Sequence, residues 1–321
     1  MLYPLQLHAA LKDYLWGGTK LKTEFNKKSD LAIVAESWEL SCHKDGQSII
    51  ANGQYKDLNL SEYINKVGKS VLGTNAEKFT YFPILIKLID AAGNLSVQVH
   101  PENEYALRVE GEYGKTEMWY IVDAEPGATL LYGFKNKISK AEFKERIENN
   151  TLLEVCNSVP VKKGDVFFID AGTLHAIGKG IIIAEIQQNS NTTYRIYDYG
   201  RVGTDGRPRQ LHVNKALDVT KLEPPTRPCT AEAEMDFLQD FSIKLLAQCE
   251  YFKVYNINIK KACELVADNT SFQSVVALDG EMELRSAVNT LKLAKGDSVF
   301  IPAGLGNYTI SGKGEIILSM V

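Results

Sequence analysis

The chain has 321 residues, of which 45% are hydrophobic and 24% are charged, and its formal net charge is −4. These values are ordinary for a globular protein with enough residues for one large or two modest domains. The slight acidic excess argues against a nucleic-acid partner, because nucleic-acid-binding domains carry a basic surplus.

The sequence carries no pattern typical of a membrane or export segment. Its apolar runs, such as 181–183, are strand-sized and far below the ~20 residues of a membrane helix. Residues 1–18 lack the basic region and apolar core of a signal peptide. The five cysteines are scattered and form no CxxC pair, which is typical of reduced intracellular thiols. We therefore expect a cytoplasmic protein that does not bind membranes.

The first third of the chain alternates between strand and helix patterns. Residues 1–55 show alternating apolar positions and turn signals, which predict β-structure. Residues 58–72 change to helical spacing, with Ser61 as the expected N-cap and Gly73 as the expected end. The apolar segment 80–91 then predicts a strand.

Residues 95–119 combine polar and apolar faces in an unusual way. In the predicted strand LSVQVHP, Ser96, Gln98 and His100 share one face, while the two valines share the other. Residues 102–114 predict a short helix closed by a glycine, and residues 115–124 predict the next strand. On that strand Lys115, Glu117 and Trp119 share a face. Two polar rows of this kind are typical of strands that line a cavity.

The remaining elements follow in order. Residues 138–150 predict an exposed amphipathic helix capped by Ser139, residues 159–201 predict several strands, and residues 212–219 predict a short helix. The proline-rich segment 224–228 marks a domain boundary, and mainly short strands are expected from 236 onward.

One segment of the chain is repeated. Residues 163–177 (KGDVFFIDAGTLHAI) recur at 295–310 (KGDSVFIPAGLGNYTI), so that His175 matches Asn307. The repeat predicts two copies of one supersecondary unit, of which the second lacks the histidine. We expect domains at 1–230 and 236–321, with the second serving as a packing or lid module without a metal.

The histidines and the acid of these motifs suggest a metal centre. Gln98, His100, Glu117 and His175 are the side chains that a catalytic divalent metal uses when it keeps a position open for water or substrate. Two histidines and one carboxylate also suit iron. His8, His43 and His212 occur outside these motifs and are expected to be surface or core residues.

The motifs resemble those of a known superfamily. The frame Gly164, Asp170, Gly172 and His175 resembles the second signature motif of cupins, although cupins have proline where Asp170 stands. Together, SVQVHP, GKTEMWY, AGTLHAIGKG, AESWELS and LWGG resemble the type I phosphomannose isomerases in their short bacterial form. The resemblance covers nearly the whole chain. It implies a mainly β protein with two cupin-type jelly-roll barrels and helical insertions in the first.

The resemblance also implies an activity and a set of residues. It implies a zinc enzyme that interconverts mannose 6-phosphate and fructose 6-phosphate, with one zinc ion per chain, as a monomer or weak homodimer. The implied ligands are Gln98, His100, Glu117 and His175. The implied catalytic and substrate residues are Arg195, Lys115 and Glu185, and Ser96 and Lys87 for the phosphate.

The residue types fit the chemistry of an aldose–ketose isomerase. Such an enzyme moves a proton between C1 and C2 through an enediolate, so it needs a cation near oxygen and a base near carbon. Lys115 and Glu185 are both candidates for the base. Arg195 stays charged at neutral pH, so it can hold the enediolate or the phosphate but cannot take the proton. A non-haem iron dioxygenase and a non-catalytic sugar-binding cupin remain alternatives.

Overall fold

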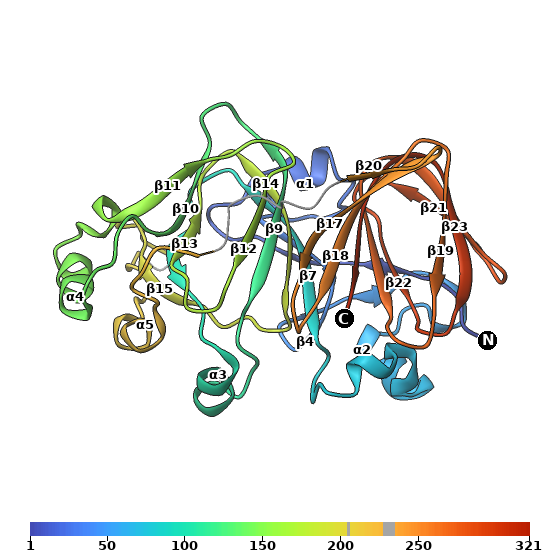
Figure 1. Ribbon diagram of the computed structural model, residues 1–321, viewed down its shortest axis with the longest axis horizontal. Coiled ribbons are helices and arrows are strands. Elements are labelled where there is room, and N and C mark those ends of the chain that lie inside the picture. The colour runs from blue at the N-terminus through green and yellow to red at the C-terminus, as the bar shows by residue number, and fades with distance from the viewer. Residues whose placement is uncertain (204–205, 227–234) are drawn as a thin grey trace.

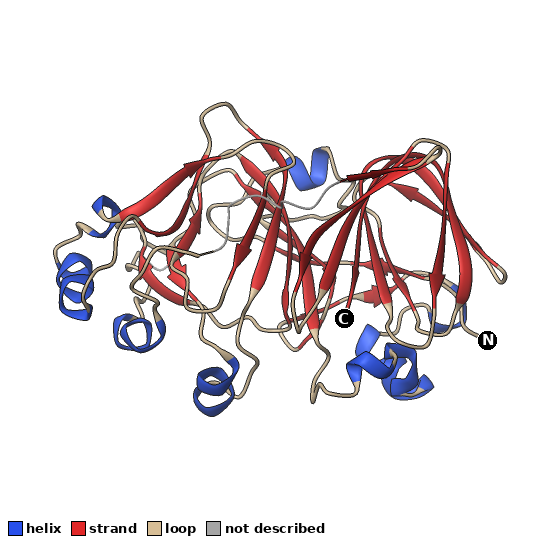
Figure 2. Cartoon of the chain, viewed as in Figure 1, coloured by secondary structure: helices blue, strands red, loops and turns tan. Residues whose placement is uncertain are grey.

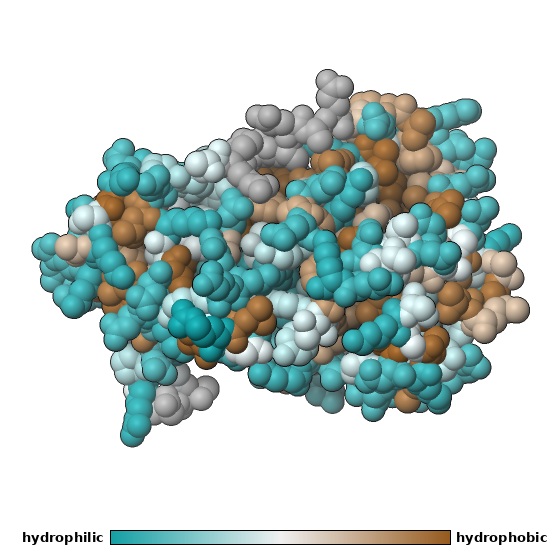
Figure 3. All heavy atoms as spheres, turned by 60° about the horizontal axis from the view of Figure 1, so that its bottom comes forward, coloured by the Kyte–Doolittle hydropathy of each residue, from teal (hydrophilic) through white to brown (hydrophobic). Residues whose placement is uncertain are grey.

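The computed structural model describes residues 1–203, 206–226 and 235–321. It consists of two β-barrel lobes that lie side by side, with most of the helices gathered along one side and at one end (Figures 1 and 2). The expected mainly β architecture is confirmed. The face shown in Figure 3 is covered largely by hydrophilic residues, with small hydrophobic groups between them.

Two sheets form the first lobe. Within the described residues, one sheet has six strands, in the order β12 (Val166–Ile169), β9 (Glu117–Ala124), β14 (Ile181–Gln188), β7 (Ile84–Ala91), β3 (Glu36–Leu40) and β2 (Ala10–Lys12). The other has five, in the order β11 (Cys156–Pro160), β10 (Thr129–Phe134), β13 (His175–Ile177), β8 (Val97–Val99) and β15 (Tyr194–Tyr197). A small hairpin of β4 (Cys42–His43) and β5 (Gly46–Gln47) lies beside them.

The second lobe is a single larger sheet. In the described part of the chain it contains β16 (Met235–Phe237), β17 (Phe241–Gln248), β18 (Lys253–Ile259), β23 (Gly306–Met320), β20 (Gln273–Ser286), β22 (Ser298–Ile301), β1 (Leu5–His8) and β6 (Ile49–Ile50), with β19 (Ala262–Ala267) on β23 and β21 (Thr290–Ala294) on β20. Strands β20 and β23 have 14 and 15 residues, so the expectation of mainly short strands was wrong for these two.

The N-terminal strands cross between the lobes. Leu5 pairs with Phe300 in the antiparallel ladder of β1 and β22, and β6 pairs with β1. The second lobe is therefore completed by residues from the start of the chain. The predicted boundary near 230 falls partly on residues 227–234, which lie outside the described residues.

The helices lie at the edges of both lobes, and the helical segment 60–76 lies against the second lobe (Figure 1). They are α1 (Lys20–Thr23), α2 (Leu60–Val67), α3 (Asn103–Val109), α4 (Lys140–Glu148) and α5 (Val213–Val219), with short 3₁₀ turns η1 (Gly53–Tyr55), η2 (Lys69–Leu72), η3 (Thr74–Ala76) and η4 (Leu152–Glu154). The predictions for α3, α4 and α5 are confirmed, and the Ser139 hydroxyl caps α4 by accepting from the Glu142 backbone N–H at 3.0 Å.

The predicted ends of α2 were wrong. Its N-cap is Asn59, whose backbone N–H donates to the Glu62 carboxylate at 2.8 Å, as in a capping box. Ser61 lies inside the helix and contacts Gln47. The helix ends at Gly68, which has a φ of 108°, and Gly73 instead follows the 3₁₀ turn η2.

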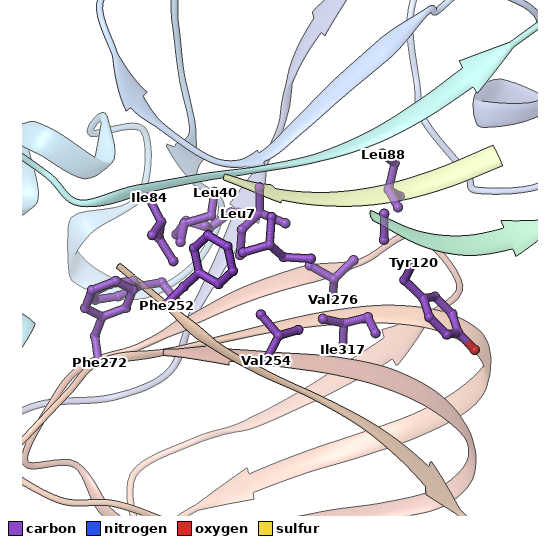
Figure 4. Packing of buried hydrophobic residues seen from close by; sticks show 14 of the residues in the cluster. Leu7, Leu40, Ile84, Leu88, Tyr120, Phe252, Val254, Phe272, Val276 and Ile317 are labelled. Atoms are coloured by element: carbon purple, nitrogen blue, oxygen red, sulfur yellow. The ribbon is translucent and has the colours of Figure 1, made fainter. Parts of the chain in front are cut away.

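A large hydrophobic core joins the two lobes. Figure 4 shows Leu88 and Tyr120 of the first lobe facing Val276, Ile317 and their neighbours from the second. Burying each large apolar side chain stabilises the fold by roughly 1.5–3 kcal/mol. A separate apolar cluster, which includes Val275, fills the second barrel.

Alternation along β9 serves both the core and the barrel interior. Met118 and Tyr120 face the core between the lobes, whereas Trp119 and Ile121 face the interior of the first barrel. The Tyr120 hydroxyl donates to the buried Glu315 carboxylate of the second lobe at 2.5 Å. Strand β9 is therefore fixed on one face by contacts between the lobes.

The repeat predicted from the sequence is confirmed as a structural repeat. β12 and β22 occupy equivalent positions of the two copies, and the preceding glycines, Gly164 and Gly296, have φ values of 91° and 94°. His175 and Asn307 match in sequence, but their side chains point in different directions, because His175 is buried in the first barrel. Asn307 is exposed, whereas the next residue, Tyr308, is buried in the second barrel.

These two glycines provide a matched stability test. Alanine at either site is strained by the positive φ, which costs about 1–3 kcal/mol. A Cβ at Gly164 meets nothing within 4 Å, whereas a Cβ at Gly296 would lie 2.0 Å from the Phe25 carbonyl oxygen. We predict that G296A lowers the free energy of unfolding in urea more than G164A does. Equal losses would show that the close approach of the Phe25 backbone to Gly296 does not matter for stability.

Candidate metal and active site

Three buried side chains converge inside the first barrel. His100 follows β8, Glu117 begins β9 and His175 begins β13, and one potential ligand atom from each lies within 4.8 Å of the others. All three are at most 1% exposed. The structure therefore brings together three of the four residues predicted as ligands from positions far apart in the sequence.

Hydrogen bonds orient His175 toward the carboxylate. Its Nδ1 lies 2.8 Å from the Thr173 carbonyl oxygen, and only a protonated Nδ1 can donate there. This leaves a lone pair on Nε2, which lies 3.4 Å from Glu117 Oε1. Among the described residues, neither of these two facing atoms has a hydrogen-bond partner. The His100 Nε2 atom lies 3.8 Å from Glu117 Oε2.

Burial sets the protonation of the three groups. It lowers the pKa of His175 to about 4, and burial followed by the nearby Lys115 cation lowers the pKa of His100 well below its usual value. Burial also raises the pKa of Glu117 to about 8. Neutral imidazoles and a carboxylate short of compensating charge are a donor set that a divalent cation satisfies. The residues present therefore fit a metal of the zinc or iron type.

Gln98 lies next to this set on β8. It is the direct antiparallel partner of His175 on one side and of Arg195 on the other. Its neighbours Val97 and Val99 are fully buried on the opposite face, so the predicted alternation is confirmed. Its role as a fourth ligand stays a prediction.

Lys115 approaches the same carboxylate. Its Nζ atom lies 3.2 Å from Glu117 Oε2 and 3.2 Å from His100 Nε2, and the residue is 5% exposed. The structure thus brings this predicted catalytic residue to the three donors.

Lys87 and Glu185 form a second buried charge group. They are direct partners in the β7–β14 ladder, and Lys87 Nζ lies 3.3 Å from Glu185 Oε2 and 3.4 Å from Glu36 Oε2. Burial opposes its charge, but the two carboxylates raise the pKa of Lys87. Trp38 donates to Glu36 at 2.7 Å and Trp119 donates to Glu185 at 2.9 Å.

This charge group changes the interpretation of Lys87. The sequence indicated that an inward lysine needs an anionic partner, and the structure supplies two glutamates. Glu36 was missed from the sequence, because its pairing with Lys87 depends on the alignment of β3 with β7. The indolyl ring of Trp119 also stands edge-on to His175, with ring centroids 5.3 Å apart, so this group borders the metal set.

Arg195 lies in a cluster of basic residues at the half-buried side of the site. Its Nη1 donates to the Gln210 carbonyl at 3.1 Å, and burial lowers its pKa, with nearby Arg209 adding to the effect. Arg201 and Arg209 both donate to the buried Asp198, each with a 2.5 Å contact. Burial opposes ionisation of Asp198, but these bonds hold its pKa below the usual value.

Ser96 belongs to the same region. It is 5% exposed and stands two residues after Asn94, whose carbonyl accepts from Arg201 at 2.5 Å. Asp198, Arg201 and Arg209 were not predicted from the sequence. The only signal was the density of arginines after Tyr197, which does not reveal that a single aspartate holds two of them.

One cavity lies outside this set. It has a volume of about 620 Å³ and lies between α2 and the segments 79–82 and 111–113. None of the predicted site residues lines it, although His43 and Glu112 form part of its wall. The chemistry described above is therefore built in the barrel interior and not in this cavity.

The chain matches two family models. Residues 4–126 match the catalytic domain of type I phosphomannose isomerase, and residues 242–321 match the cupin domain of mannose-6-phosphate isomerase. It is 36% identical to the mannose-6-phosphate isomerase of Streptococcus mutans, over 99% of this chain and 98% of the relative. It is 37% identical to mannose-6-phosphate isomerase ManA of Bacillus subtilis, over 98% of each.

The chain belongs to the type I phosphomannose isomerase family. The family predicted from the motifs is thus confirmed. The crystal structure of the mannose 6-phosphate isomerase from Bacillus subtilis superposes with a TM-score of 0.92 at 34% identity and covers 99% of both chains. The predicted cupin-type fold is confirmed by this match and by the cupin domain model.

A solved structure from a more distant relative shares the fold. A putative mannosephosphate isomerase from Archaeoglobus fulgidus has a TM-score of 0.76 at 24% identity. In the present chain, no helix within the described residues is long and apolar enough to cross a membrane.

The raised pKa of Glu117 predicts a proton-coupled metal site. At pH 7 the metal-free carboxyl is mostly protonated, because its pKa is about 8, and a metal binds only the carboxylate. We predict release of about one proton per Zn²⁺ bound at pH 7 and much less at pH 9. Calorimetry in two buffers of different ionisation enthalpy measures this number. Equal proton release at both pH values would contradict the prediction.

Proposed function

We propose that this chain interconverts mannose 6-phosphate and fructose 6-phosphate. Its relatives carry the name mannose-6-phosphate isomerase. The observation that supports this most strongly is the convergence of His100, Glu117 and His175 with Lys115 at 3.2 Å from two of them. His100, Glu117 and His175 offer a site for a cation, and Lys115 offers a nitrogen base beside it, all buried inside the first barrel.

We propose one zinc ion per chain, held by His100, Glu117 and His175, with Gln98 as the fourth ligand. The bound ion would act as a Lewis acid that stabilises negative charge on the sugar oxygens. The Thr173 carbonyl accepts a hydrogen bond from the Nδ1–H of His175, which keeps the Nε2 lone pair available. Trp119 limits the rotation of the same ring by edge-on packing.

Lys115 is the proposed base. It takes the proton from C2 of mannose 6-phosphate, which leaves an enediolate. The hydroxyl proton then moves from the oxygen on C2 to the oxygen on C1, and Lys115 returns its proton to C1 to give the ketose. Glu185 is less suited to this step, because one of its oxygens accepts from Trp119 and the other pairs with Lys87. We assign Glu185 to holding Trp119 and Lys87 in place.

The phosphate is assigned to the basic side of the site. Arg201 and Arg209 are preorganised by Asp198, and Arg195 lies opposite Gln98 on the neighbouring strand. Arginine suits phosphate because its planar group donates two hydrogen bonds at once. We propose Ser96 as a further phosphate contact beside these arginines, as predicted from the sequence. Lys87 is assigned as the counter-ion of Glu36 and Glu185.

One assay tests the function against its alternatives. We expect the purified protein to convert mannose 6-phosphate in a coupled assay, to lose activity with a chelator and to regain it with zinc. Failure to isomerise with zinc supplied would refute the proposal, and oxygen uptake with iron would favour a dioxygenase.

The variant K115M separates the base from the metal site. We expect a fall in kcat of about 10²–10⁴-fold, the usual contribution of general base catalysis, with zinc still bound. A fully active K115M would assign the proton transfer to another group.

Arginine substitutions test the phosphate assignment. We predict that R201M raises KM for mannose 6-phosphate at least tenfold and changes kcat less, because phosphate binding is shared by the ground state and the transition state. R146M is the control, since Arg146 lies on α4 and pairs with Glu142 and Glu154 away from the site. An unchanged KM in R201M would contradict the assignment.

A further inference from the structure

Glu112 joins two segments that lie beside the metal set. Its Oε1 lies 3.4 Å from His43 Nε2 and 2.7 Å from Lys44 Nζ, both at the β4–β5 hairpin. Its Oε2 accepts from the Asn191 backbone N–H at 3.3 Å and from the Thr192 hydroxyl at 3.4 Å. One carboxylate therefore connects its own loop to the hairpin and to the segment that follows β14.

His43 is built to hold this carboxylate. It is 5% exposed, and its Nδ1 accepts from the Asp45 backbone N–H at 3.1 Å. In the neutral ring the proton is therefore on Nε2, which faces Glu112. The Asn191 side chain donates to Asp45 at 2.8 Å, so the hairpin and the segment after β14 are also tied directly. Trp38 packs edge-on against the His43 ring.

Both segments lead to groups of the metal set. Lys115 stands three residues after Glu112, and its backbone N–H donates to the carbonyl of Pro101, the residue after His100, at 3.1 Å. The Thr192 backbone lies beside His100 and favours its charged form. The contacts of Glu112 therefore lie one step away from the base and from one metal donor.

We propose that Glu112, held by His43, is a positioning residue that sets Lys115 and His100 against Glu117. It contacts neither of them and does not enter the proton transfer. Its effect on turnover rests on the proposed isomerase function, whereas its effect on metal affinity does not. The burial of His43 distinguishes this pair from the contact with Lys44, whose side chain is 72% exposed and contributes little.

Four variants of the full chain test the proposal. E112Q keeps the size of the side chain and removes its charge, and H43F removes the donor but keeps an aromatic ring against Trp38. H43Q restores an amide donor near the Nε2 position, and K44M removes the exposed partner of the same carboxylate. For each, kcat and KM are measured with mannose 6-phosphate, zinc affinity by competition with a chromogenic chelator, and folding by thermal melting.

We expect E112Q and H43F to lower kcat about tenfold with KM changed less than twofold, and to weaken zinc binding about tenfold, as loss of an orienting partner does. H43Q and K44M are expected to stay within about twofold of the wild type. If E112Q and H43F lower only the melting temperature, the role is structural and the proposal is overturned.

Two further outcomes would also overturn it. An equal loss in K44M would assign the effect to the exposed pair, and an equal loss in H43Q would show that the donor at Nε2 is not what matters. If E112Q does not fold, H43F and H43Q still test the proposal, which requires that H43F lose kcat and zinc affinity and that H43Q keep them. If the wild type binds zinc but does not isomerise, the proposed function fails, and the zinc affinities alone judge the role of Glu112.

Discussion

A carboxylate buried without enough positive charge is the constraint on which the site depends. Glu117 is fully buried, and transferring a charged group from water into a protein costs several kcal/mol unless it is compensated. Lys115 supplies one cation at 3.2 Å, while the two histidines are kept neutral by burial. A bound divalent ion would complete the compensation, so that binding it would also relieve the electrostatic cost of burying Glu117.

The same strand holds this carboxylate and the junction of the lobes. Because side chains alternate along β9, Glu117 and Trp119 face the barrel while Met118 and Tyr120 face the second lobe. The hydrogen bond from Tyr120 to Glu315 and the apolar core shown in Figure 4 therefore fix the backbone that carries the metal donor. Rigid support from behind is what a site with tight geometric demands requires.

Local patterns in the sequence predicted the features that depend on neighbouring residues. Alternation placed Ser96, Gln98 and His100 on one face, and the Ser139 cap and the short helices were confirmed. The N-cap of α2 was misplaced although Glu62, three residues after Asn59, carried the signal of a capping box.

Features that depend on distant pairing could not be read in this way. The pairing of Leu5 with Phe300 joins opposite ends of the chain, and no local pattern encodes it. Glu36 met Lys87 only through strand register, and Asp198 gathered two arginines through a loop. The family resemblance supplied what spacing alone could not, namely that His100, Glu117 and His175 belong to one site.

The two copies of the repeat show how one backbone supports two interiors. After equivalent strands and equivalent glycine turns, the first copy directs His175 inward, and the second directs Tyr308 inward. Tyr308 donates to Gln273 at 2.5 Å among apolar side chains that fill the second barrel. The apolar side chains that fill the second barrel stabilise the fold through their burial, whereas the first barrel holds charged groups whose burial costs free energy. The second lobe thus contributes to the shared core the stability that a polar catalytic interior cannot supply for itself.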